Sequence, residues 1–379
     1  MNVILLGATG SIGSQTLELM KVHRDTLIGF SFGNNLLKAI QIIDEFQPQI
    51  VCAKQPRHAE QLQTRFPTLK VVVGESGLEE LAGYPVEATL VNALVGSVGL
   101  RPTVKAIKSR KRICLANKET LVIAGELIMK LVKEYDVELL PIDSEHAAIH
   151  QAMQGDLNIA SIVLTASGGS LRDWPVDQLQ YATKQDVLQH PNWSMGEKIT
   201  VDSATMMNKG FEVIEAHHLF GLSFDLIETI LHPQSLVHGM VRYHDGSVLA
   251  HIAPPTMSIP IAYALYHPLK IKLPTWDLMT LSTLEFSMLD EQRYPLLTLA
   301  REVGIRGGIH PCVMNAANEA AVRLFLEEHI PFPMIETIIR ETIASIPNEP
   351  LESIDQIVIL DQSIQADVYN KYKTERRSS

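Results

Sequence analysis

Two acidic residues stand two positions apart where an apolar run ends, in the stretch "LLPIDSEHAA" at residues 139–148. Asp143 and Glu145 suit the N-terminus of a helix, where the first backbone N–H groups lack partners and favour negative charge. They also suit a metal ion, because alternate residues of an extended segment project from the same face. Capping does not exclude ligation, so this stretch alone leaves both interpretations open.

A second group of polar side chains lies in "TVDSATMMNKGFEVIEAHH", residues 200–218. If a helix begins near Asn208, Glu212 and Glu215 lie one turn apart and can face the same site. Lys209 places a positive charge near that helix start, where hydroxyl and amide donors would also suit a phosphate group. The alternative is a capped surface helix with solvated acids.

Three carboxylates from these two stretches could share one ion. Asp143, Glu145 and Glu212, with water completing the shell, would suit Mg²⁺ or Mn²⁺, whereas zinc prefers histidine and cysteine ligands. We therefore expect a hard divalent cation if the fold gathers them.

A glycine-rich turn stands near the start of the chain, in "ILLGATGSIGSQ". Gly7, Gly10 and Gly13 lie between a predicted strand and a predicted helix, where bare backbone lets a pyrophosphate approach the N–H groups of the helix start. The spacing is GxxGxxG rather than GxGxxG, and a turn without a ligand is the alternative. We predict a dinucleotide site.

The end of the second predicted strand bears on which dinucleotide binds. NAD-binding units usually place an acidic residue there, which accepts a hydrogen bond from the ribose 2′-hydroxyl. Gly33, Asn34 and Asn35 stand at this place, with Lys38 nearby. Since no carboxylate would repel a 2′-phosphate, we predict NADP(H) rather than NAD(H).

The elements that must position these residues follow from the hydrophobic pattern. Short apolar runs alternate with helical patterns, a rhythm typical of a parallel α/β sheet. Asn117, Lys118 and Glu119 follow one such run, at the strand end where ligands bind in doubly wound sheets. The predicted strands are Val3–Leu6, Leu27–Phe32, Gln49–Ala53, Lys70–Val73, Thr89–Val91, Arg112–Ala116 and Val137–Leu140.

Beyond Asp143 the pattern mixes strands and helices, with a hairpin turn signal at Asp245-Gly246. Five prolines between Pro254 and Pro274 predict an irregular crossing segment without a regular helix. Helical spacing then returns in four segments, which is consistent with a small helical bundle. These segments are Pro295–Val303, Val313–Glu328, Pro333–Ile346 and Ser353–Lys373.

The predicted fold class is α/β, with an N-terminal Rossmann-type parallel sheet, a central α+β catalytic domain and a C-terminal helical bundle. The expected domains are residues 1–143 for NADPH binding, residues 144–266 for catalysis, a linker over residues 267–292, and the bundle over residues 293–379.

Composition argues against several classes of function. The net charge of −11 gives no broad basic surface for nucleic acid, although a local basic pocket for an anionic substrate is compatible with it. Cys52, Cys114 and Cys312 stand far apart without CxxC pairing, which argues against a disulfide framework or a thiolate zinc site. With a strand predicted from residue 2 and no apolar run of membrane-spanning length, we expect a cytoplasmic protein without membrane contact.

Seven stretches, read in order, carry a resemblance to a known family. They are "GATGSIG", "LANKE", "PIDSEH", "TASGG", "HPNWSMG", "DSATMMNKG" and "HPQSLVHGMVRY". Together they closely resemble the 1-deoxy-D-xylulose 5-phosphate reductoisomerases of the non-mevalonate isoprenoid pathway. The resemblance runs from residue 3 into the predicted C-terminal bundle.

This resemblance implies an NADPH-dependent oxidoreductase that rearranges and reduces 1-deoxy-D-xylulose 5-phosphate to 2-C-methyl-D-erythritol 4-phosphate. It also implies a divalent cation (Mg²⁺, Mn²⁺ or Co²⁺), a small sugar-phosphate substrate, and a homodimer that pairs through residues 144–266. No nucleic acid or membrane partner is expected.

The resemblance also implies roles for individual residues. Asp143, Glu145 and Glu212 match the metal-binding positions, and Lys118 and His190 join them as catalytic residues because either could move a proton. The residues expected to bind NADPH are Thr9, Gly10, Ser11, Ile12, Gly33, Asn34, Asn35, Asn117, Glu119 and Gly196. Those expected to contact the substrate are Lys118, Ser144, Glu145, Ser167, His190, Ser203, Asn208, Lys209 and Glu212.

Two positions depart from the family's pattern. Asn34 stands where relatives often have lysine, which weakens one expected contact to the 2′-phosphate and so bears on the strength of the NADP preference. Ala166 replaces a frequent glycine before Ser167. Neither position belongs to the expected metal ligands.

Two other functions are alternatives. A short-chain-type NADP-dependent dehydrogenase or epimerase would need Tyr-x-x-x-Lys on a helix, and Tyr266 and Lys270 have that spacing, but Pro268 between them disfavours the helix. A non-enzymatic dinucleotide-sensing protein would share the glycine-rich turn but would not need clustered acids and a phosphate pocket.

Overall fold

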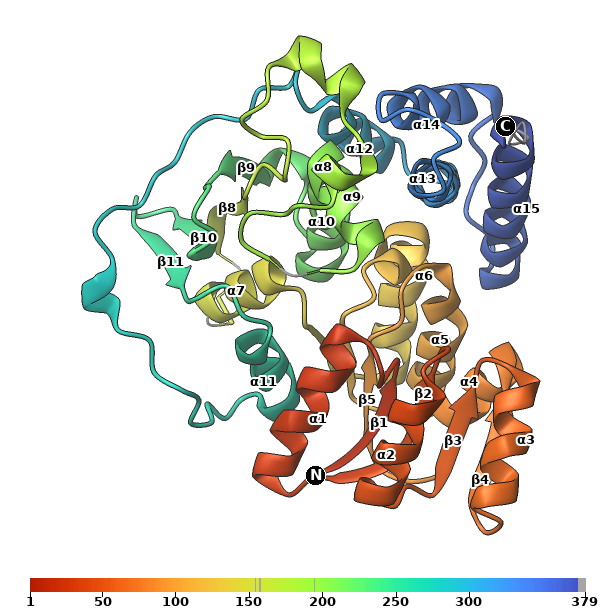
Figure 1. Ribbon diagram of the computed structural model, residues 1–379. Coiled ribbons are helices and arrows are strands. Elements are labelled where there is room, and N and C mark those ends of the chain that lie inside the picture. Colours follow the sequence, from red (N-terminus) through yellow and green to blue (C-terminus); the bar gives the residue numbers. More distant parts are fainter. Residues whose placement is uncertain (154, 157, 194, 374–379) are drawn as a thin grey trace. The chain divides into compact units, whose positions relative to one another are not determined.

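The computed structural model describes residues 1–153, 155–156, 158–193 and 195–373, which form two compact units (Figure 1). The chain leaves the first unit and later returns to it, so neither unit is continuous in sequence. The predicted domain boundaries at residues 143, 266 and 292 stay predictions. The first unit contains Met1–Thr120, Glu126–Ala147 and Thr256–Thr275, and the second contains Leu121–Gly125, Ala148–Pro255 and the described part of Trp276–Ser379.

A seven-stranded parallel sheet in the order β4-β3-β2-β1-β5-β6-β7 forms the centre of the first unit. Strands β3, β5 and β6 are buried along their whole length, as expected for a parallel sheet between two layers of helices. Every strand predicted for this region is present. The strands are β1 (Asn2–Leu6), β2 (Thr26–Phe32), β3 (Ile50–Ala53), β4 (Lys70–Val73), β5 (Thr89–Asn92), β6 (Ile113–Leu115) and β7 (Leu139–Pro141).

Helices connect these strands in the manner of a doubly wound sheet. The strand order reverses between β1 and β5, which is where such folds open a crevice for ligands at the carboxyl ends of the strands. The connecting elements are α1 (Ser11–His23), α2 (Leu36–Phe46), α3 (Pro56–Arg65), α4 (Gly74–Ala82), η1 (Ser97–Gly99), α5 (Leu100–Lys108) and α6 (Glu119–Tyr135), and α7 (Ser144–Met153) follows the last strand.

The glycine-rich turn after β1 is crowded by backbone. Gly7 has a φ of +83°, and a Cβ atom there would lie 2.6 Å from the Ala93 carbonyl oxygen, just beyond β5. At Gly13, in the first turns of α1, a Cβ atom would lie 2.3 Å from the Gly7 carbonyl oxygen and 2.6 Å from Ala8 Cα. The turn therefore folds tightly back on α1 only because these positions lack side chains.

Helix α11 (Ser258–Tyr266) belongs to the first unit, although it follows the second unit's sheet in sequence. The expectation of an irregular segment is therefore wrong over these residues. Pro260 lies in the first turn of α11, where a missing backbone N–H costs no intrahelical hydrogen bond. Arg112 ties the end of α11 to β6, donating to the carbonyl oxygens of Leu265 at 3.1 Å and His267 at 2.8 Å.

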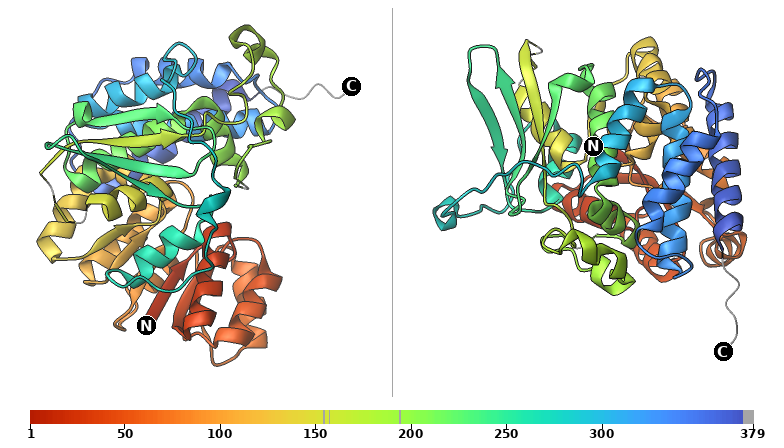
Figure 2. Two further views of the ribbon diagram at one scale, coloured as in Figure 1. Left: turned by 90° about the vertical axis from the view of Figure 1, so that its left-hand side faces the viewer. Right: turned by 90° about the horizontal axis from the view of Figure 1, so that it is seen from above.

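The second unit contains a four-stranded sheet in the order β11-β10-β8-β9. Strand β10 is antiparallel to β11 and β8, and the predicted hairpin turn at Asp245-Gly246 joins β10 to β11. Helix α10 packs against β8 and β9, and helices α10, α12 and α13 lie on one side of the sheet (Figure 2). The strands are β8 (Ile159–Ala166), β9 (Ile227–Leu231), β10 (Val237–Tyr243) and β11 (Val248–Ile252).

The remaining helices of the second unit include the predicted bundle, in which α13 packs against both α14 and α15. All four predicted C-terminal helices are present, and the predicted α/β fold class is confirmed. Across the described residues, no helix combines the length and apolar character needed to cross a bilayer. The helices are η2 (Val176–Tyr181), α8 (Lys184–Val187), α9 (Glu197–Thr205), α10 (Met207–Phe220), η3 (Phe224–Leu226), η4 (Leu278–Thr280), α12 (Pro295–Arg306), α13 (His310–Leu326), α14 (Met334–Ser345) and α15 (Ile354–Tyr372).

The crowding at Gly13 predicts a loss of stability when a side chain is added. Gly13→Ala should lower the free energy of unfolding by about 1–3 kcal/mol or more, the usual cost of overpacking. Gly33→Ala is the matched control, because a Cβ atom there meets nothing within 4 Å. Thermal unfolding followed by circular dichroism should show a lower midpoint for the first variant only. Equal midpoints would contradict the packing described here.

Candidate functional site

Asp143 and Glu145 lie at the start of α7, not on an extended segment as the sequence suggested. Helix α7 begins at Ser144, and the backbone N–H of Glu145 donates to Asp143 Oδ1 at 3.3 Å. The capping interpretation is therefore correct. The two carboxylates still converge, because an oxygen of each lies within 4.8 Å of the other. Ser144 donates its hydroxyl hydrogen to Glu145 Oε2.

Asp143 is held between two cationic or potentially cationic groups. Lys118 Nζ lies 2.9 Å from its Oδ2 atom, and His146 Nδ1 lies 3.2 Å from its Oδ1 atom. Burial alone would raise the pKa of Asp143, but Lys118 and His146 outweigh it and hold that pKa well below its usual range. His146 was not among the residues predicted from the sequence. Its position three residues after Asp143, one helical turn away, was the available signal.

Asn117 and Glu119, both expected to bind cofactor, lie at the carboxyl end of β6. The Asn117 side-chain amide donates to the carbonyl oxygens of Leu94 at 3.1 Å and Gly96 at 2.9 Å, in the loop after β5. It also lies 2.9 Å from Glu119 Oε2, and both side chains are buried. These contacts fix the polar residues that follow β6. They lie near the place where the strand order of the sheet reverses, which is where ligands bind in doubly wound sheets.

The predicted cofactor residues of the glycine-rich turn open helix α1. Gly10 is the N-cap residue, Ser11 and Ile12 begin the helix, and among the described residues no side chain caps it. Thr9 contributes its carbonyl oxygen to a hydrogen bond from Lys38 Nζ at 3.4 Å. An uncapped helix start over bare backbone fits a pyrophosphate, whose oxygens accept from backbone N–H groups.

The three residues predicted to bind cofactor at the end of β2 have different local roles. Asn35 caps α2 by accepting from the Lys38 backbone N–H at 3.1 Å. Asn34 accepts from Gln55 Nε2 at 2.7 Å, and so joins the loops after β2 and β3. Gly33 faces open space, since a Cβ atom there would meet nothing within 4 Å.

In the second unit, Ser167 and His190 form a hydrogen-bonded pair with an assignable tautomer. His190 Nδ1 accepts from the backbone N–H groups of Asn192 at 3.2 Å and Trp193 at 3.0 Å. The hydrogen of the neutral ring must therefore be on Nε2, which donates to Ser167 Oγ at 3.1 Å. Burial, together with the nearby charge of Arg172, lowers the pKa of His190 to about 4. Arg172 was not singled out from the sequence.

Ser203 and Gly196 lie on the helix that follows this loop. Gly196 is the N-cap residue of α9, and Ser203 lies in its last turn. A Cβ atom at Gly169 would lie 2.6 Å from the Ser203 carbonyl oxygen, so the loop after β8 packs directly on the end of α9. This packing brings the Ser167 loop and Ser203 into one region of the second unit.

Asn208, Lys209 and Glu212 gather on the first turns of α10, which begins at Met207, one residue before the start considered from the sequence. Asn208 Nδ2 donates to Glu212 Oε1 at 2.6 Å, and Lys209 Nζ pairs with Glu212 Oε2. Lys209 and Glu212 are only 3% and 1% exposed, so this carboxylate is compensated inside the protein rather than solvated. Of the three expected metal ligands, Asp143 and Glu145 belong to the first unit and Glu212 to the second.

The arrangement disfavours the short-chain dehydrogenase alternative. Tyr266 is the last residue of α11, and Lys270 lies beyond the helix end, so the pair does not share a helical face. The Tyr266 hydroxyl instead donates to Asp25.

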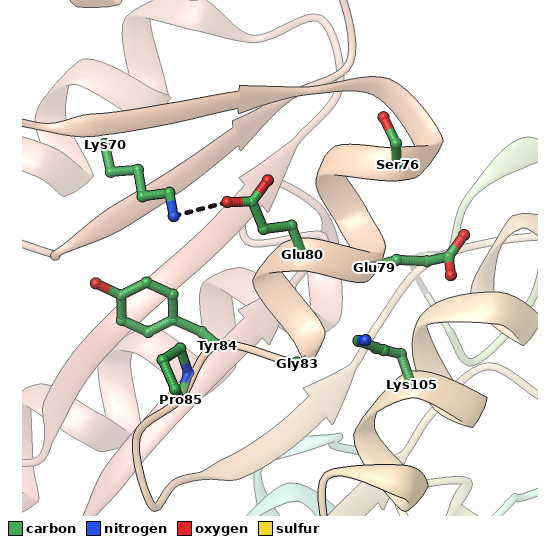
Figure 3. A pocket seen from close by; sticks show the side chains of 8 residues that line it. All are labelled: Lys70, Ser76, Glu79, Glu80, Gly83, Tyr84, Pro85 and Lys105. Atoms are coloured by element: carbon green, nitrogen blue, oxygen red, sulfur yellow. Dashed lines mark ion pairs between the residues drawn. The ribbon is translucent and has the colours of Figure 1, made fainter.

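A hollow of about 450 Å³ lies apart from all predicted site residues, between β4, α4 and α5 (Figure 3). Lys70 and Glu80 face each other across it as an ion pair at 2.6 Å, and Tyr84 lies beside them. Its charges are therefore already balanced within the protein, and we assign no ligand to it.

Comparison with known sequences identifies the family. Residues 3–125, 139–220 and 252–366 match models of the reductoisomerase itself and of its two C-terminal domains. The chain is 46% identical over 367 residues to 1-deoxy-D-xylulose 5-phosphate reductoisomerase of Bacillus cereus, covering 95% of this chain and 97% of the relative. The chain belongs to the 1-deoxy-D-xylulose 5-phosphate reductoisomerase family. The Bacillus subtilis member is 48% identical over 352 residues, covering 90% of this chain and 92% of that one.

Solved structures of reductoisomerases resemble this chain over its whole length. A DOX-P reductoisomerase in complex with NADPH, fosmidomycin and magnesium is 37% identical, with a TM-score of 0.93 and 100% of both chains covered. The reductoisomerase from Zymomonas mobilis in complex with NADPH is 35% identical, with a TM-score of 0.91 and 99% of both chains covered. The resemblance inferred from seven sequence stretches is thereby confirmed.

The tautomer and burial of His190 predict its titration. Because its pKa of about 4 lies below the ordinary value of 6.5, the unfolded chain binds a proton that the folded chain does not between these pH values. The stability contributed by neutral His190 should therefore be lost as pH falls from 6.5 toward 4. NMR titration of the imidazole C–H signals, assigned with His190→Asn, should show this pKa, and Arg172→Met should raise it. An imidazole pKa near the ordinary value of 6.5 would contradict a neutral, buried His190.

Proposed function

We propose that this chain converts 1-deoxy-D-xylulose 5-phosphate into 2-C-methyl-D-erythritol 4-phosphate, using NADPH and a divalent cation, for isoprenoid precursor synthesis. The observation that carries the proposal is the nearly buried Asp143, whose pKa is held low beside Lys118 at the start of α7, in a chain that matches reductoisomerases over 95% of its length. The chain is accordingly an oxidoreductase.

We assign the divalent cation to Asp143, Glu145 and Glu212. The donor set fits, because these residues offer only carboxylate oxygens, which hard cations prefer. Two of the carboxylates already accept a positively charged partner, since Lys118 pairs with Asp143 and Lys209 with Glu212. When bound, the cation supplies Lewis-acid polarisation of the substrate carbonyl, and NADPH supplies the hydride. Magnesium is the ion named in the related structure, and we propose that Mn²⁺ and Co²⁺ also serve.

Lys118 is the better candidate for moving a proton. Its ammonium group is nearly buried and donates to Asp143, so it can hold a proton beside the reacting oxygens. His190 is less suited to that task, because its low pKa keeps it neutral near pH 7 and its Nε2–H is engaged by Ser167.

Ser167 and His190 instead suit positioning of the substrate. Ser167 Oγ accepts from His190 Nε2 at 3.1 Å and from the Gly169 backbone N–H at 3.2 Å. With both lone pairs engaged, the Ser167 hydroxyl hydrogen is directed away from these partners and is available to a substrate oxygen. Ser144, Ser203, Asn208 and Lys209 are proposed to bind the remaining hydroxyl and phosphate groups.

The NADPH site is assigned to the first unit's glycine-rich turn, to the ends of β2 and β6, and to Gly196. We propose a cytoplasmic enzyme, since Cys52, Cys114 and Cys312 are buried free thiols, which suits a reducing compartment.

We also propose a homodimer that pairs through the second unit's sheet. Strand β11 lies at the sheet edge, and Val248, Leu249 and Ile252 are 50%, 40% and 40% exposed there. An exposed apolar edge strand favours pairing with a second copy.

The metal assignment predicts the effect of removing single carboxylates. Asp143→Asn and Glu212→Gln should each lower kcat at ordinary Mg²⁺ concentration by on the order of 100-fold or more, because Lewis-acid stabilisation is worth several kcal/mol. Glu302→Gln, an exposed residue of α12, is the control and should keep normal turnover. The measurement is NADPH oxidation with 1-deoxy-D-xylulose 5-phosphate, with and without a chelator.

Normal turnover of the Asp143→Asn variant would refute the metal assignment. Binding of NADPH by the wild-type chain without any turnover would instead favour the dinucleotide-sensing alternative. Turnover of another substrate that survives a strong chelator would favour a short-chain-type enzyme.

The dimer proposal predicts that a charge on β11 disrupts association. Leu249→Lys should shift the mass measured by light scattering from two chains toward one, since a charge would be buried without a partner. Val22→Lys, at an exposed apolar position of α1 in the first unit, should leave the mass unchanged. A wild-type chain that is monomeric at micromolar concentration would contradict the proposal.

A further inference from the structure

The feature that separates NADPH from NADH is the 2′-phosphate of the adenosine ribose. In a doubly wound sheet this ribose lies between the turn after the first strand and the end of the second strand. In this chain that interval is bounded by Thr9 to Ser14 on one side and by Gly33 to Lys38 on the other. A side chain that selects NADPH must therefore bring positive charge into this interval.

We propose that Lys38 binds the 2′-phosphate of NADPH and so determines the preference for NADPH over NADH. The inference rests on the proposed function, because it assumes that the glycine-rich turn binds a dinucleotide. Asn34 and Asn35 cannot supply the charge themselves, and their side-chain oxygens are engaged by Gln55 Nε2 and by the Lys38 backbone N–H.

The position of the Lys38 ammonium supports this role. Lys38 lies in the first turn of α2, yet its Nζ atom reaches across to the glycine-rich turn. There it donates to the Thr9 carbonyl oxygen at 3.4 Å and to Ser14 Oγ. One side chain thus joins the two loops between which the ribose lies.

The charge of Lys38 is also uncompensated. Both of its hydrogen-bond partners are neutral, and among the described residues no carboxylate lies within 4.0 Å of its ammonium group. By contrast, Lys21, Lys118 and Lys209 each pair with a carboxylate. A half-buried ammonium without a counter-charge favours an anion, and a phosphate can accept charge-assisted hydrogen bonds from it.

Two other basic residues stand near the same edge of the sheet. Lys54 and Arg57 follow β3, the next strand along, and both are exposed. Within the described residues neither donates a hydrogen bond to the glycine-rich turn, whereas Lys38 donates two. Arg57 therefore provides a matched control, since Arg57→Met removes one positive charge from the same edge.

The test measures binding rather than turnover. Dissociation constants for NADPH and for NADH would be determined with the full chain by isothermal titration calorimetry, without substrate or metal. Lys38→Met should weaken NADPH binding by about 10- to 100-fold, the range expected for a hydrogen bond to a charged group, and should change NADH binding by less than about threefold. Lys38→Arg should retain the preference, and Arg57→Met should leave the ratio of the two constants near its wild-type value.

Three results would overturn the inference. An equal loss of NADPH and NADH affinity in Lys38→Met would mean that Lys38 only holds the glycine-rich turn through Thr9 and Ser14. Unchanged affinity for both dinucleotides in Lys38→Met, or a collapse of the ratio in Arg57→Met, would assign the phosphate elsewhere. A wild-type chain that binds neither dinucleotide would instead refute the proposed function itself, so the two failures are distinguishable.

Discussion

A carboxylate taken out of water is tolerated only if positive charge or several hydrogen-bond donors compensate it, and the candidate site depends on this constraint. Asp143 is compensated by Lys118 and His146, and Glu212 by Lys209 and Asn208. These contacts hold the pKa of Asp143 well below its usual range and pair Glu212 with an ammonium group inside the protein. A divalent cation would compete with the same lysines for the same oxygens, so its affinity and the lysine positions are linked.

Close backbone approach is the second organising feature, and it recurs in both units. The turn after β1 admits no side chain at Gly13, and the loop after β8 admits none at Gly169. In each case the crowded glycine stands two positions after a residue expected to contact a ligand, namely Ser11 and Ser167. In both loops, close contact between backbone atoms therefore limits the conformations that the chain can adopt.

Sequence patterns predicted the strands well because buried parallel strands read as short apolar runs between helical patterns. They also identified the chemical types at the site. They failed where local geometry decides: at Pro260 a proline is tolerated because it stands in a first turn, so α11 forms where an irregular segment was predicted. At Asp143 the sequence left capping and an extended segment both open, and the capping hydrogen bond at the start of α7 decides between them. His146 and Arg172 were missed because their roles depend on spatial neighbours rather than on their own type.

Helix α11 adds a constraint on how the first unit can exist. Its Ile261 and Leu265 side chains are fully buried in the same apolar cluster as Val3 and Leu5, more than 250 positions earlier in the chain. A fragment that stopped after β7 would expose this cluster to water and invite aggregation. The first unit is thus not an autonomous module of the polypeptide: it is completed only after the ribosome has synthesised the intervening sheet.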